Sequence, residues 1–162
     1  MRVCGLPCAI ILANNTRLKQ EAKEHAAAKK KMKTRAEWSR DAQSAVNKYV
    51  RVRDAHLGCI SCDKHADWDG QWHAGHYRSV GSAPHLRFDA DRNIFRQCSQ
   101  DNLYQSGNLI EMRKRMIERI GLETVEAIEA DQSTKHYTID DLKMIIKKYK
   151  EKTKDILNTP TL

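Results

Sequence analysis

The sequence predicts a mostly helical α+β fold in which a small zinc-supported core is flanked by N-terminal and C-terminal helices. Apolar residues recur at helical spacing over residues 37–57, 109–120 and 139–156. Short extended segments and turn residues fill the region between the first two helices, residues 59–108. Cysteines in that region have the spacing of zinc ligands, and only 6% of the 162 residues are aromatic. We therefore expect a metal to support a small core.

The N-terminal residues 1–35 are predicted to form a basic arm. Residues 17–35 contain eight Lys and Arg against two Glu, without an apolar stripe, which favours a solvated helix. Such an arm either contacts phosphates or serves as a solubilising linker. Cys4 and Cys8 are either half of a cysteine knuckle or two free thiols. Nucleic-acid contacts are predicted for Lys29, Lys30, Lys31, Lys33, Arg35 and, within the core, Arg78.

The remaining helices follow from apolar spacing and from their terminal residues. The helix over 37–57 is expected to stop at Gly58, and the stripe from Leu109 to end at Gly121. A short helix is expected over 123–130, and Thr138 with Asp141 predicts a capping box that begins the last helix. The predicted organisation is an arm over 1–35, a core with its flanking helices over 36–130, and a basic amphipathic helix over 131–162.

The cysteines of the central region predict a zinc site. Cys59 and Cys62 form a Cys-x-x-Cys turn that places two thiolates on one side of the backbone, and Cys98 supplies a third sulfur. The fourth ligand is expected three residues later, at Asp101, whose carboxylate oxygen also binds zinc. The alternative leaves Asp101 in water and gives the fourth position to His65, His73, a water or nothing.

Two histidines lie on a predicted hairpin limb over residues 72–77. His76 is the candidate general base for phosphodiester hydrolysis, and Asn102 is a candidate ligand for a hard cation, Mg²⁺ or Mn²⁺. His73 is a metal ligand, a second base or a surface residue. Side chains alternate along a strand, so His73 and His76 are predicted to face opposite sides. Taken alone, His76 also fits a buried structural histidine.

The net charge of the chain indicates which kind of partner it binds. It has 29 Lys and Arg against 21 Asp and Glu, a net charge of +8 and a pI near 9.3, which favours nucleic acid as a partner. There is no apolar run of 18 residues, so no membrane span is expected, and no segment has the length of a signal-peptide core. We expect an intracellular protein with reduced cysteines.

Five blocks of the sequence, in order, resemble the NinG, or Rap, recombination family of lambdoid phages. They are CISC at 59–62, QWHAGHYRS at 71–79, APHLRFD at 83–89, RNIFRQC at 92–98 and SGN at 106–108. The resemblance implies an HNH-like treble-clef fold with a ββα core, zinc at the three cysteines, and metal-dependent cleavage of branched DNA such as Holliday junctions. It also implies His76 as the motif histidine, Asn93 as the brace of the hairpin and Asn102 beside a catalytic metal.

The resemblance also has departures, which keep several functions open. Asp101 stands where family members usually carry a cysteine, and His73 where an acid is familiar. Cys4 and Cys8 match only the second half of an N-terminal four-cysteine pair, so a shortened N-terminus is expected. The functions considered are a structure-specific endonuclease, a non-catalytic zinc-dependent DNA-binding accessory protein, and an inactive prophage remnant.

The setting that the resemblance implies is the cytoplasm of a bacterial host, with branched DNA and recombination proteins as partners. Two-fold symmetric junctions favour a homodimer.

Overall fold

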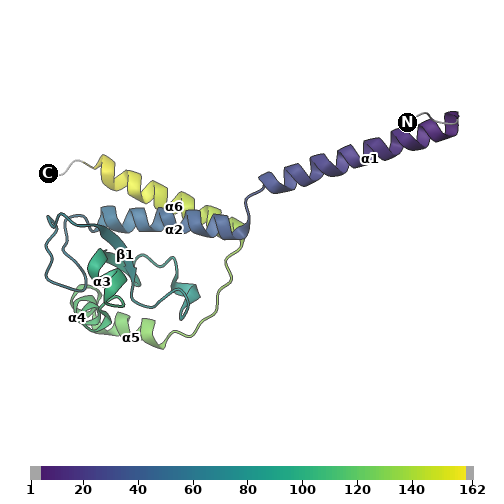
Figure 1. Cartoon of the computed structure of the whole chain (residues 1–162). Coiled ribbons are helices and arrows are strands. Elements are labelled where there is room, and N and C mark those ends of the chain that lie inside the picture. Colours follow the sequence, from purple (N-terminus) through teal and green to yellow (C-terminus); the bar gives the residue numbers. More distant parts are fainter. Residues whose placement is uncertain (1–4, 160–162) are drawn as a thin grey trace. The chain divides into compact units, whose positions relative to one another are not determined.

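The computed structural model describes residues 5–159, which fall in two units that meet between Thr34 and Arg35 (Figure 1). The first unit contains one helix, α1 (Leu6–Lys31), and every side chain described in it is exposed. A solvated helix was predicted from the missing apolar stripe, but α1 begins well before residue 17.

Several predictions for this first unit concern positions that the structure does not describe. Cys4 lies outside the described residues, as do the side chains of Cys8, Lys29, Lys30 and Lys31. The knuckle at the two cysteines and the phosphate contacts of the three lysines therefore stay predictions.

The second unit contains two long helices that lie side by side, α2 (Arg35–Arg53) and α6 (Ile139–Asn158) (Figure 1). The predicted apolar face of α2 is buried against α6, and Tyr49 of α2 stacks on Tyr149 of α6 with ring centres 5.1 Å apart. The predicted capping box at Thr138 and Asp141 begins α6. This helix pair forms one core, whose buried residues are Ala42, Val46, Tyr49, Val50, Phe88, Ala90, Ile94, Leu142 and Tyr149.

The prediction that the helix over 37–57 stops at Gly58 is wrong, because α2 ends at Arg53. The buried Arg96 guanidinium donates to the carbonyl oxygens of Asp54, Ala55 and Leu57 at 3.3, 2.8 and 2.6 Å. A side chain from a distant strand thus binds the carbonyl groups of the turn that follows α2. Gly58 instead permits a close approach, since a Cβ there would lie 2.5 Å from the carbonyl oxygen of residue 64.

The only sheet among the described residues has two antiparallel strands, β1 (Trp72–His76) and β2 (Ile94–Cys98), with His73 opposite Gln97. Residues 77–93 connect them and include a 3₁₀ turn, Pro84–Leu86. The sequence predicts a return limb over Leu86–Cys98 with a turn at Asp89–Asn93, and strand β2 begins only after this turn, at Ile94. Helix α3 (Ser99–Tyr104) follows β2 directly. The mostly helical α+β class is confirmed.

The second core lies on the other side of β2. Helices α4 (Leu109–Ile120) and α5 (Leu122–Ala130) match the two predicted segments and pack their buried side chains around Phe95. Neighbouring residues of β2 therefore enter different cores, Ile94 the helix-pair core and Phe95 the second core. All five residues of β2 are buried, and the strand leads through Cys98 directly into α3. Within the described residues, no helix combines the length and apolar character that a membrane span requires.

Candidate metal centre and adjoining histidines

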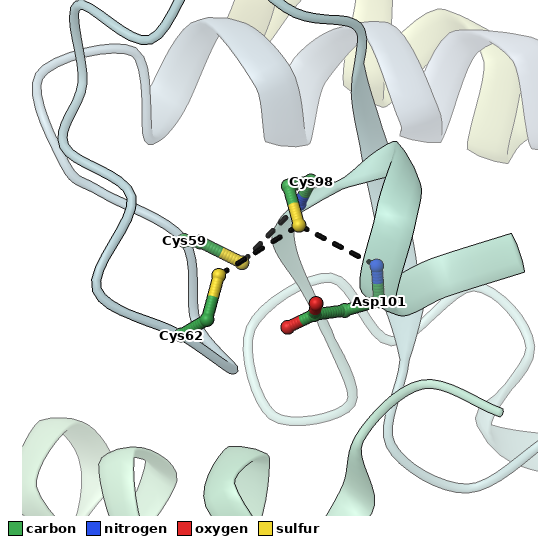
Figure 2. A group of neighbouring side chains, drawn as sticks. All are labelled: Cys59, Cys62, Cys98 and Asp101. Atoms are coloured by element: carbon green, nitrogen blue, oxygen red, sulfur yellow. Dashed lines mark hydrogen bonds between the residues drawn. The ribbon is translucent and has the colours of Figure 1, made fainter. Parts of the chain in front are cut away.

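Three cysteines and one aspartate converge between the two cores (Figure 2). One ligand atom from each of Cys59, Cys62, Cys98 and Asp101 lies within 4.8 Å of all the others. Zinc–ligand bonds of 2.0–2.3 Å in a tetrahedron place the ligand atoms about 3.5 Å apart. The Sγ atoms of Cys62 and Cys98 are 3.7 Å apart, so this pair of sulfurs has the spacing of zinc ligands.

Backbone N–H groups point at the sulfur atoms of this cluster. The N–H of Cys98 donates to the Sγ of Cys59 at 3.2 Å, and the N–H of Ser61 donates to the same sulfur at 3.5 Å. Cys98 is the N-cap of α3, where its Sγ accepts the N–H of Asp101 at 3.5 Å. Hydrogen bonds from N–H groups stabilise a thiolate, which is the form that binds zinc.

Asp101 is held by the residues around it. It is 2% exposed, and the Ser61 hydroxyl donates to its Oδ2 at 2.6 Å. The Ser61 hydroxyl in turn accepts from Gln97 at 2.8 Å, while the Ser61 carbonyl oxygen accepts from Asn108 at 2.8 Å. Such partners orient a metal ligand. The alternative that places Asp101 in water is therefore wrong.

The histidines considered for the fourth ligand position do not join the cysteines. Among the described residues, the group suited to a metal contains Asp101 and neither His65 nor His73. No role was predicted from the sequence for Ser61, Gln97 or Asn108, although Ser61 and Asn108 lie in the CISC and SGN blocks.

The thiol pKa values differ within the cluster. Burial raises the pKa of Cys62 to about 12, and it also raises the pKa of Cys98. Burial acts the same way on Cys59, but hydrogen bonds from Ser61 and from the Cys98 amide outweigh it and lower the pKa of that thiol. A divalent cation that takes all three sulfurs as ligands therefore displaces protons on binding.

Replacing Asp101 by cysteine is expected to raise the affinity for zinc and the melting temperature. The change supplies a fourth thiolate, a softer ligand than a carboxylate, at a position already within ligand distance. Zinc affinity is measured by competition with a chelator, and stability by thermal melting. Asp101→Asn is the matched control, because it keeps an acceptor for Ser61 and removes the charge, and it should bind zinc more weakly. If Asp101→Cys raises neither the zinc affinity nor the melting temperature, residue 101 is not a zinc ligand.

His76 stands at the end of β1, where a backbone group fixes its ring. Its Nε2 lies 3.0 Å from the carbonyl oxygen of Arg87 and donates to it in the neutral tautomer. Burial lowers the pKa of His76, so the ring is neutral at pH 7. Nδ1 then carries the free lone pair. His76 lines a hollow that also contains Tyr77, Ser106 and Glu129.

His73 and Asn102 meet on a different side of the strand. The Asn102 Nδ2 of α3 lies 2.9 Å from the Nδ1 of His73, and both residues line a hollow with Arg51 and Trp72. The two histidines thus open into different hollows, as strand alternation predicted. Asn102 lies beside His73 in the structure, although its place in the sequence predicts a role together with His76.

Asn93 and Arg78 hold the connection between the strands. Asn93 is fully buried, accepts the Arg78 N–H at 2.8 Å and donates to the carbonyl oxygens of Arg78 and Leu86 at 3.0 and 3.2 Å. The Arg78 guanidinium donates to the carbonyl oxygen of Ile128 at 2.8 Å and also to that of Asp131, at the end of α5. Arg78 therefore has a structural role in addition to its predicted contact with nucleic acid.

The other predicted phosphate contacts lie at the junction of the two units. Arg35 begins α2, is exposed and donates to the carbonyl oxygen of Tyr137 at 3.4 Å. Lys33 is also exposed.

Comparison with known proteins places the chain among phage proteins. The family model described as "Bacteriophage Lambda NinG protein" matches residues 10–159. The chain is 44% identical over 128 residues to Protein ninG of Escherichia phage lambda, covering 79% of this chain and 61% of that relative. It is 45% identical over 125 residues to Protein ninG of Salmonella phage P22, covering 77% of this chain and 60% of that relative. The chain thus spans less than two thirds of the length of these relatives, and no solved structure matches it.

The family model covers nearly all of the core in which the cysteine cluster, the histidine strand and helix α3 were found. On the strength of that match, the chain belongs to the NinG family of lambdoid phages.

Proposed function

We propose that the protein is a metal-dependent, structure-specific DNA endonuclease that acts on branched recombination intermediates of phage or prophage DNA. The observation that carries this proposal is His76, a neutral histidine at the end of a strand with its Nε2 held by a backbone carbonyl. That arrangement leaves Nδ1 to accept a proton at neutral pH, as a general base requires. Membership in the NinG family and the net charge of +8 agree with a DNA substrate.

We assign the core to the HNH-like treble-clef class. Its Cys-x-x-Cys turn precedes a hairpin, the second strand ends in Cys98, and helix α3 follows at once. Cys59, Cys62, Cys98 and Asp101 would hold a structural zinc ion, which would fix the turn to the hairpin and to α3. Zinc held in this way stabilises the fold and leaves the chemistry to other residues.

The proposed reaction is hydrolysis of a phosphodiester. A water oxygen forms a bond to phosphorus as the bond to the leaving sugar oxygen breaks, Nδ1 of His76 takes the water proton, and the leaving oxygen takes a proton from solvent water. In the hollow on the other side of the strand, the Oδ1 of Asn102 would hold a Mg²⁺ or Mn²⁺ ion, which when bound stabilises charge on phosphate oxygens there. His73 would join as a ligand once the ion displaces the Asn102 amide from its Nδ1. Two protein ligands suffice for such an ion, because water and substrate phosphate complete its shell.

The cleavage test uses a synthetic four-way junction with Mg²⁺ or Mn²⁺. Replacing His76 by alanine is expected to lower the cleavage rate about 10²- to 10⁴-fold, the usual contribution of a general base. His56→Ala is the matched control, because His56 is exposed and lies outside both hollows. Thermal melting and junction binding are measured alongside, so that loss of folding is recognised. Equal cutting by wild type and His76→Ala would remove His76 from the mechanism.

The hollow on the other side of the strand needs its own variants. His73→Ala and Asn102→Ala are expected to raise the Mg²⁺ concentration needed for half-maximal cleavage. If His73→Ala abolishes cleavage while His76→Ala does not, the base is His73.

A second candidate function is a non-catalytic, zinc-dependent DNA-binding protein of recombination. One observation favours it, namely that His76 and Asn102 line different hollows. Tight binding of the junction with no cleavage in Mg²⁺ or Mn²⁺ would support this function over the nuclease.

A further inference from the structure

Helix α2 presents a polar face opposite the face that it buries in the core. Arg40, Ser44, Asn47 and Arg51 recur at intervals of four, three and four residues, which places them on one stripe of the helix. Both arginines are exposed, and neither forms an ion pair with any residue in 5–159. Because no carboxylate among residues 5–159 neutralises these two arginines, their positive charges are available to an anionic ligand.

Two hollows adjoin along this stripe and share Asn47 and Arg51. The first is lined by Arg40, Arg51 and Arg87 together with polar side chains of α2, and the second continues to His73 and Asn102. No Asp or Glu lines either of them. Together the two hollows form one groove, the α2 groove, which is lined by neutral and positively charged side chains and ends at His73 and Asn102.

Arg87 supplies a third cation that the fold holds in place. Its Nε donates to the Oε1 of Gln43 at 3.0 Å, and its guanidinium carbon lies 5.2 Å from the centre of the Phe88 ring. Burial lowers the pKa of Arg87, yet a guanidinium stays charged throughout the physiological range. A guanidinium with a fixed orientation is suited to phosphate, because its N–H groups match two phosphate oxygens.

We infer that the α2 groove binds the sugar–phosphate backbone of one DNA strand and leads that strand to His73 and Asn102. The inference rests on the proposed function for its choice of DNA and adds a binding surface outside the N-terminal arm. Arg40 and Arg51 are separated by about 16 Å along the helix axis, at about 1.5 Å per residue. One strand of B-form DNA presents a phosphate about every 3.4 Å along the duplex axis, so a distance of about 16 Å is long enough for both arginines to contact different phosphates of the same strand.

The test measures DNA binding without requiring cleavage. A fluorescein-labelled four-way junction is titrated with protein in EDTA at several salt concentrations, and binding is followed by fluorescence anisotropy. The groove variant carries Arg40→Gln and Arg51→Gln. It should bind at least tenfold more weakly than wild type, and its salt dependence, log K against log salt, should be shallower by about 1.8, or 0.9 for each lost phosphate contact.

The matched control carries Arg92→Gln and Lys114→Gln, which removes the same charge from exposed sites outside the groove. It should keep the wild-type salt slope. Equal losses in the two double variants would overturn the inference, since net charge alone would then explain them, and so would unchanged binding by the groove variant.

Failure of this inference and failure of the proposed function give different results. If wild type binds the junction but never cleaves it, while the groove variant loses binding, the groove stands and the nuclease fails. If wild type cleaves and the groove variant binds normally, the nuclease stands and the groove fails. A single-stranded RNA competitor that displaces the junction from wild type more effectively than duplex DNA does would overturn the choice of DNA.

Discussion

Replacement of Cys98 by serine is expected to abolish zinc binding and to unfold the unit that begins at Arg35. Cys98 is fully buried, ends β2, caps α3 and lies 3.7 Å from the Cys62 sulfur. A structural zinc contributes on the order of 10 kcal/mol of binding free energy to folding, as much as the total stability of a typical domain. Zinc content by elemental analysis should fall from about one per chain to near zero, and the cooperative thermal transition should disappear.

The matched control for this variant is Ala83→Ser. It also places a hydroxyl at a fully buried position, but Ala83 lies in the second core and contributes nothing to the cluster. This control should keep one zinc per chain and lose about 1–3 kcal/mol, the cost of burying an unsatisfied hydroxyl. A Cys98→Ser protein that retains zinc and melts like Ala83→Ser would contradict the role of the cluster in folding.

Replacement of Asp54 by asparagine is expected to destabilise the protein by about 3 kcal/mol, because it removes a buried carboxylate that is the counter-charge of two partly buried guanidinium groups. Asp54 is fully buried at the end of α2 and accepts two hydrogen bonds from Arg53, at 2.7 and 2.8 Å. It also accepts from the Arg119 side chain and, at 3.1 Å, from the Arg96 N–H. One carboxylate therefore joins α2, β2 and α4. The loss is measured by urea unfolding at pH 7.

The effect of Asp54 should depend on pH. Burial alone would raise the pKa of this carboxyl, but Arg53 and Arg119 outweigh burial and hold it below the ordinary value of 3.8. A lowered folded-state pKa gives stability that is complete above the unfolded value and is lost as pH falls through the folded value. The difference between wild type and Asp54→Asn should therefore be constant above about pH 5 and shrink below about pH 4.

Asp91→Asn is the control for the aspartate variant. Asp91 is exposed and its carboxylate lies 3.9 Å from the Lys152 ammonium, so the change should cost less than about 0.5 kcal/mol at pH 7. Similar losses of unfolding free energy in Asp54→Asn and Asp91→Asn would show that the ion pairs of Asp54 do not stabilise this unit more than a surface ion pair does.

Residue patterns with a local cause were readable from the sequence. The apolar period and Gly121 gave α4, and the Thr138–Asp141 pair gave the start of α6, because a cap and a stripe act within one or two turns. The cysteine spacing predicted the cluster, since a Cys-x-x-Cys turn places its own thiolates together. Strand alternation likewise separated His73 from His76.

Features that depend on distant residues were not readable in this way. The end of α2 was misplaced because Arg96, some forty residues along the chain, binds the carbonyl groups of Asp54 and Ala55 in the turn that follows the helix. The partner of Asn102 was misjudged because only the packing of α3 against β1 decides which histidine it meets. The α2 groove was missed for the same reason, since Arg87 joins Arg40 and Arg51 only after the connection between the strands has folded.

The sequence by itself determined helices α4, α5 and α6, most of α2, the three cysteines of the cluster and the basic charge of the chain, because these follow from residue spacing and composition. The tertiary structure alone decided that Asp101 is buried at the fourth position. Asp101 can be buried because the Ser61 hydroxyl, from the Cys-x-x-Cys turn, donates to its carboxylate, and because the Gln97 amide, from β2, donates to that hydroxyl. Without these partners the carboxylate would require water.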